Sequence, residues 1–177
     1  MNRTLNPEKI KQELTDAYEK FGDAIFRYCF GQTSDREKAL DLTQETFTRA
    51  WQYLSDGKKI EQIRPFLYRI ATNAIIDDRR KRKTVSLDAL MEEGFDYANG
   101  TDEQEQKEIT FESGQAVELI KKLDEKYKDV LMLRYVDELS VKEIAEIVGE
   151  SENNVSVRIH RGLDKLEKLI RSEHNNT

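Results

Sequence analysis

Asn154, Arg158 and Arg161 are spaced so that one α-helix would carry all three side chains near one face. Amide and guanidinium groups of this kind hydrogen-bond the base edges and phosphates of DNA, and a helix that carries them fits the major groove. Their spacing therefore predicts a nucleic-acid contact, provided that the surrounding sequence forms a helix and holds it on a supporting element.

The preceding residues predict that support. From Leu139 the sequence reads L-S-V-K-E-I-A-E-I-V-G-E-S, in which Ser140 and Glu143 have the spacing of a capping box. Gly149 can take the positive φ of a helix end, and Ser151 is a favourable N-cap for the next helix. A helix-turn-helix is therefore expected. The buried side of its second helix would be an apolar stripe of Val155, Ile159, Leu163, Leu166 and Ile170.

A second Arg/Asn face lies in the first half of the sequence. Arg69, Asn73 and Arg80 would lie along one side of a helix over 65–82, which ends in the basic run 79–83. Basic runs are common on ordinary surfaces, but this one follows a face of hydrogen-bond donors. That combination favours phosphate contacts. The polar loop 55–64 precedes the helix and could approach the same nucleic acid.

The helix expected over 35–54 has an unusual polar side, formed by Asp41, Gln44, Glu45 and Thr48. Two interpretations remain open: a solvated acidic face above a core aromatic pair, or a protein-docking face around an aromatic anchor. The residues expected to point inward on this helix are Leu40, Phe47, Ala50, Trp51 and Leu54.

Three segments together resemble a known family. They are D-L-T-Q-E-T-F-T-R-A-W (41–51), F-L-Y-R-I-A-T-N-A-I-I-D-D-R-R-K-R-K (66–83) and L-R-Y-V-D-E-L-S-V-K-E-I-A-E-I-V-G (133–149), the last followed by V-R-I-H-R-G. In order and spacing they resemble the small bacterial sigma factors of the extracytoplasmic-function (ECF) group. The resemblance covers about residues 14–171.

The resemblance implies a subunit that binds core RNA polymerase and directs promoter-specific initiation. It implies a polymerase-docking face of Asp41, Gln44, Glu45 and Phe47. It implies −10 recognition and melting by Lys58, Lys59, Arg69, Asn73, Arg79 and Arg80. It implies −35 recognition by Asn153, Asn154, Ser156, Arg158, His160 and Arg161. Ser156 stands where many members have a lysine, and His160 either contacts a phosphate or packs at the helix edge.

The predicted fold is all-α, with two small helical domains joined by an acidic flexible linker. Further helices are expected over 7–30, 114–123 and 124–136. Residues 86–112 contain nine acidic side chains and one lysine, and are the expected linker between a region 2 domain (1–85) and a region 4 domain (113–177). Because the net charge is −6, the isolated chain is expected to bind DNA weakly.

Composition argues against several other functions. Two histidines and one cysteine have no metal-ligand spacing, and there is neither a Gly-rich phosphate loop nor a nucleophile–base pair. No enzyme activity, cofactor, metal or small-molecule substrate is expected. The lone Cys29, on an apolar stripe, is expected to be a buried thiol. It suits a reducing cytosol, and the N-terminus has no secretory signal, so a cytoplasmic location is expected.

The expected partners are core RNA polymerase, promoter DNA and, by the resemblance, an anti-sigma factor. The alternative function is a free-standing helix-turn-helix regulator. That alternative accounts for residues 139–171, but it assigns no role to the faces within 41–51 and 66–83.

Overall fold

A computed structural model describes residues 7–87 and 114–174 of the chain, and within these ranges every regular element is helical. The expectation of an all-α protein is thereby confirmed. The elements are α1 (Pro7–Thr33), α2 (Arg36–Ser55), α3 (Ile63–Leu87), α4 (Gly114–Lys121), α5 (Glu125–Leu131), the π-helical segment η1 (Met132–Val136), α6 (Val141–Val148) and α7 (Glu152–His174). No helix in the described part of the chain is long and apolar enough to cross a membrane.

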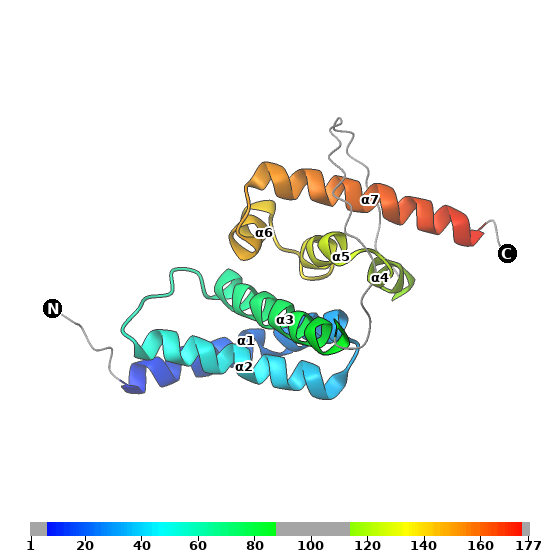
Figure 1. The fold of residues 1–177 in the computed structure, drawn as a ribbon. Helices are drawn as coiled ribbons and strands as arrows, with labels where there is room; N and C mark the ends of the chain where they lie inside the picture. The colour runs from blue at the N-terminus through cyan, green and yellow to red at the C-terminus, as the bar shows by residue number, and fades with distance from the viewer. Residues whose placement is uncertain (1–6, 88–113, 175–177) are drawn as a thin grey trace.

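The first three helices form one module, in which α1 and α2 pack side by side and α3 lies across them (Figure 1). The apolar spacing along α1 predicts a buried stripe of six residues: Ile10, Leu14, Ala17, Phe21, Ile25 and Cys29. All of them are buried except Phe21, which is half-buried. Asp35 begins α2 as expected, because its carboxylate accepts a hydrogen bond from the Lys38 amide at 3.1 Å. The Tyr28 and Thr72 hydroxyls form a buried hydrogen bond of 2.9 Å that joins α1 to α3.

Two expectations for α2 are wrong. Leu40 and Trp51 were expected to point inward, but their side chains are 46% and 40% exposed. Small and β-branched side chains take their place against α1 and α3, including Ala39, Thr43 and Thr46. The two threonines satisfy their hydroxyls on backbone carbonyls one turn earlier, so they can be buried without a further partner.

The second module contains the expected helix-turn-helix. Ser140 and Glu143 make both hydrogen bonds of the capping box, and Gly149 ends α6 at φ 71°. Ser151 accepts a hydrogen bond from the Asn154 amide, which starts α7. Gly162 brings α7 close to α5, since a Cβ at this position would lie 3.1 Å from a Leu131 methyl carbon. The helix expected over 124–136 is confirmed as α5 followed by η1.

The two modules pack against each other, with α3 against α6 (Figure 1) and η1 against α1. Their buried apolar side chains form one continuous cluster. Residues 88–112 of the expected linker lie outside the described residues, whereas Ser86 and Leu87 belong to the last turn of α3. The helix expected over 65–82 is α3, which extends beyond these bounds at both ends.

Candidate nucleic-acid and protein interfaces

A cavity of about 310 Å³ opens where the loop after α2 meets the start of α3. Lys59, Gln62, Phe66 and Arg69 contribute to its lining, and Tyr53 packs against the Phe66 ring with centroids 4.8 Å apart. The Arg69 guanidinium lies 5.3 Å from the centroid of Phe66. Aromatic rings beside cationic groups form a platform on which an unpaired base can stack while its phosphate is neutralised.

The predicted Arg/Asn face of α3 continues from this cavity along the helix. Arg69, Asn73 and Arg80 are all exposed, and Ile76 lies between them with 40% of its side chain exposed. Lys58, which does not line the cavity, lies over the Tyr53 ring at 5.1 Å and 3.6 Å from Asp56. Five of the six predicted −10 residues are therefore exposed on or near this one surface.

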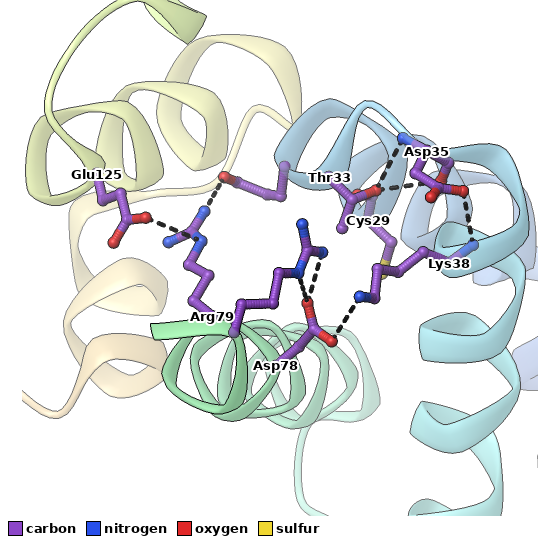
Figure 2. A network of polar contacts seen from close by, with 9 residues as sticks. Cys29, Thr33, Asp35, Lys38, Asp78, Arg79 and Glu125 are labelled. Carbon is purple, nitrogen blue, oxygen red and sulfur yellow. Dashed lines mark hydrogen bonds and ion pairs between the residues drawn. The ribbon is translucent and has the colours of Figure 1, made fainter. Parts of the chain in front are cut away.

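The sixth, Arg79, lies elsewhere. Its guanidinium is 14% exposed and reaches from α3 to the second module, where it donates to both carboxylate oxygens of Asp129 at 3.1 and 3.2 Å. It also donates to Gln32 Oε1 at 2.6 Å and lies 3.7 Å from Glu125 (Figure 2). In this arrangement Arg79 is not available to DNA. The sequence pattern gave no sign of this contact, because the partners lie 47 and 50 residues away.

The predicted docking face of α2 is assembled on one side of the helix. Asp41, Gln44 and Glu45 are exposed, and Glu45 forms an ion pair with Arg49 at 2.5 Å. Phe47 is half-buried and packs edge-on against Tyr18 of α1, with ring centroids 5.0 Å apart. The exposed side chains Tyr18, Leu40 and Trp51 extend this face with apolar surface. Such surface favours the protein-docking interpretation over a solvated acidic face.

The predicted DNA-recognition face of α7 is open to solvent at its N-terminal end. Asn153, Asn154 and Ser156 are exposed, and the Ser156 hydroxyl is held by the Glu152 carbonyl. The sequence interpretation missed Val157, whose 41% exposure on this face offers an apolar contact for a thymine methyl.

The basic side chains further along α7 are partly held by acidic neighbours. Arg158 is paired with Glu150 from the turn before the helix, and 25% of its side chain is exposed. His160 lies with Nε2 at 3.8 Å from Asp164 Oδ2, and Arg161 is half-buried. The position of His160 resembles packing at the helix edge more than an unhindered phosphate contact.

Two buried ionisable groups, Asp137 and Cys29, lie near the contact between the modules. Burial raises the pKa of Asp137 to about 6, although the Tyr68 hydroxyl and the charges of Arg27 and Arg64 oppose this shift. Burial also raises the pKa of the Cys29 thiol to about 12, which keeps it neutral. The expectation of a buried thiol is confirmed, since Cys29 is 0% exposed. The burial of Asp137 had no signal in the sequence.

Comparison with known proteins agrees with this arrangement. Residues 17–85 match the family model of Sigma-70 region 2, and residues 113–166 match that of Sigma-70, region 4. The chain is 34% identical over 165 residues to the ECF RNA polymerase sigma factor SigW of Bacillus subtilis, covering 88% of each protein. It is 32% identical over 161 residues to the RNA polymerase sigma factor YlaC of the same species, covering 90% of this chain and 93% of YlaC.

The fold also resembles that of a solved structure, the sigma factor RpoE in complex with the anti-sigma factor NepR from Bartonella quintana. The TM-score is 0.69 at 17% identity, over 90% of this chain and 98% of the other. The likeness in sequence over nearly the full length of SigW, together with both region models, fixes the family. This chain belongs to the ECF RNA polymerase sigma factors, the subunits that direct RNA polymerase to specific promoters.

Proposed function

We propose that the first module, residues 1–85, binds core RNA polymerase through α2 and opens the −10 element at the cavity beside α3. The second module, residues 113–177, reads the −35 element through α7, and residues 86–112 link the two. The observation that carries this proposal is the presence in one chain of two features: a cavity whose lining includes aromatic rings and the cationic side chains Lys59 and Arg69, and a separate helix with exposed amide side chains. A free-standing regulator would need only the exposed helix and not the cavity.

A run-off transcription assay with purified bacterial core RNA polymerase tests the proposal. Initiation is expected only when this chain is added, and sequencing of the transcripts gives the promoter elements. The alternative, a free-standing regulator, predicts a DNase footprint without polymerase and no start sites that depend on the chain. We infer that the chain contributes no catalysis of its own, because polymerase supplies the chemistry and the proposed contacts only bind and position DNA.

We also propose an anti-sigma factor as a regulatory partner. The structurally similar RpoE was solved with the anti-sigma factor NepR, and CnrH, with a TM-score of 0.65, was solved with the cytosolic domain of CnrY. The exposed apolar side chains Tyr18, Leu40 and Trp51 offer surface that such a partner could cover. Co-purification of the tagged chain from cells that produce a candidate anti-sigma factor tests this proposal, and loss of run-off activity on its addition is expected.

Replacement of Gln44 and Glu45 together by alanine is expected to weaken binding to core polymerase about 10-fold or more. Both side chains are exposed on α2 around the aromatic anchor. A combined cost of about 1.4 kcal/mol for the two truncations corresponds to a tenfold loss of affinity. Affinity is measured by titrating labelled chain with core enzyme. The control is Gln12→Ala with Glu13→Ala, an exposed pair of the same residue types on α1. Equal affinities for the two double variants would contradict the docking assignment.

Arg158→Ala is expected to reduce initiation at promoters that depend on the −35 element by about 5- to 10-fold. A bidentate contact to a base is worth about 1–3 kcal/mol, and the lower end applies because Glu150 already occupies part of the guanidinium. Arg171→Ala on the same helix is the control, since Arg171 is exposed and pairs with Glu167 of its own helix. The assignment fails if promoters with intact and scrambled −35 elements respond equally to the Arg158 change.

A further inference from the structure

The predicted DNA-recognition face of α7 has an apolar centre. Val157 is 41% exposed, and a helix places the residues three and four positions away beside it. On the N-terminal side these neighbours are Asn153 and Asn154, and on the C-terminal side they are His160 and Arg161. One isopropyl group is therefore surrounded by amide, imidazole and guanidinium groups, all of which form hydrogen bonds.

Val157 points away from the core that anchors the helix. The buried side of α7 includes Val155, Ile159, Leu163 and Leu166. Val157 follows Val155 by two residues, which in an α-helix is a rotation of about 200°. The valine side chain therefore lies almost opposite the buried stripe, at the middle of the surface that a DNA groove would meet.

Neither packing nor helix stability accounts for a valine at this position. Valine has a lower helix propensity than alanine, because its branched side chain loses χ1 freedom in a helix. Single exposed apolar residues are common on proteins, so exposure by itself assigns no role to Val157. The role follows from the place of this valine on the helix that the proposed function inserts into the major groove.

Two polar side chains next to Val157 are already engaged within the protein. The Ser156 hydroxyl donates to the Glu152 carbonyl at 2.9 Å, and the Arg158 guanidinium is paired with Glu150. An isopropyl group forms no hydrogen bond, so nothing comparable holds the valine. Val157 can therefore meet a base edge without first breaking a polar contact of the protein.

The major groove offers one apolar group to such a side chain. Thymine carries a methyl group at C5, whereas the edges of adenine, guanine and cytosine present hydrogen-bond donors and acceptors. Asparagine pairs with N6 and N7 of adenine, so the amides beside Val157 suit a neighbouring A·T pair. Contact between the isopropyl and methyl groups would remove apolar surface of both from water.

We propose that Val157 contacts the C5 methyl group of a thymine in the −35 element, and that initiation at the promoter depends on this methyl group. The inference rests on the proposed function and deepens it, because it names the chemical group that the centre of the DNA-recognition face reads. Val157 thereby joins the six residues that the sequence resemblance implies for −35 recognition.

Deoxyuridine tests this contact, because it differs from thymidine only in lacking the methyl group. The thymines of a −35 element mapped by transcript sequencing are replaced one at a time on either strand. Run-off transcription is then measured with core polymerase and a limiting amount of the full chain. One replacement is expected to lower initiation about four-fold, which corresponds to the roughly 0.8 kcal/mol for burying one such carbon.

Val157→Ala should abolish this difference, so that the thymine and uracil templates initiate equally. The matched control is Val136→Ala, which truncates a valine of the same 41% exposure on η1 and should keep the difference. Each comparison uses two templates with one protein preparation, so effects of a substitution on folding or on polymerase affinity cancel.

A methyl group added to cytosine provides the reciprocal test. At the sensitive position the thymine is replaced by cytosine or by 5-methylcytosine, with guanine opposite in both templates. The methylated template is expected to initiate about four-fold better with the unmodified chain and no better with Val157→Ala. A methyl group that has no effect on the unmodified chain, or the same effect on both proteins, would contradict the contact.

The results also separate this inference from the proposed function. If the chain starts no transcripts with core polymerase, the proposed function fails before any template is modified. If initiation requires the chain and an intact −35 element but every uracil template is used as well as its thymine parent, Val157 does not read a methyl group. The same conclusion follows if a uracil defect persists in Val157→Ala, or if the −35 element contains no A·T pair.

Discussion

Replacement of Arg69 by alanine is expected to lower transcription about 10- to 100-fold while leaving the affinity for core polymerase unchanged. The guanidinium is exposed, lies over the Phe66 ring and lines the 310 Å³ cavity beside Lys59. A base stacked on such a platform contributes about 1–3 kcal/mol, and each 1.4 kcal/mol changes a rate tenfold. The loss should appear in strand opening, because only an unpaired base can enter the cavity.

Permanganate reactivity of thymines near the start site measures opening separately from docking. Arg36→Ala is the matched control: Arg36 is also exposed and also lies over an aromatic ring, Phe26, but on α2 away from the cavity. The control should open the promoter normally. Normal melting with Arg69→Ala, or equal defects in both variants, would remove the cavity from the mechanism of opening.

Local signals in the sequence were sufficient for most of the helices. The capping box of Ser140 and Glu143, the αL glycine at 149 and the N-cap at Ser151 act within a few residues, so their geometry follows from neighbouring residue types. The apolar stripe of α1 was also recovered, since helical period alone decides which side of a long amphipathic helix is buried.

Long-range contacts could not be recovered in the same way. Leu40 and Trp51 are large and apolar, and periodicity assigned them to the core, yet Ala39, Thr43 and Thr46 allow the close approach of α2 to its neighbours. The result leaves apolar side chains exposed on the proposed docking face. Size complementarity between helices decided this, and it depends on residues far apart in the chain.

The residues of the candidate site also differ in whether local sequence or a long-range contact sets their position. The exposed positions of Arg69, Asn73 and Arg80 follow from their spacing on one helix. Arg79 is next to Arg80 in sequence, but its position is set by Asp129, 50 residues away in the other module. No pattern within α3 distinguishes an exposed guanidinium from one that is buried and paired across a module boundary.

Leu166→Ala is expected to lower the free energy of unfolding by about 2–5 kcal/mol, the range for removing a fully buried leucine side chain. Leu166 is 0% exposed in the core between α7 and its neighbours. Each module is small, and domains of roughly 65–85 residues have little stability to spare. The change should therefore unfold a measurable fraction of the second module at physiological temperature, as urea titrations followed by circular dichroism would show.

Val157→Ala on the same helix is the matched control, because it also truncates an aliphatic side chain to alanine but at a 41% exposed position. Its effect on stability should stay within about 0.5 kcal/mol, although its effect on promoter choice can be larger. The two variants together separate the helix as a packed element from the helix as a reader of DNA. A loss below about 1 kcal/mol for Leu166→Ala would mean that α7 is not anchored through this core, and that the position of its recognition face needs another explanation.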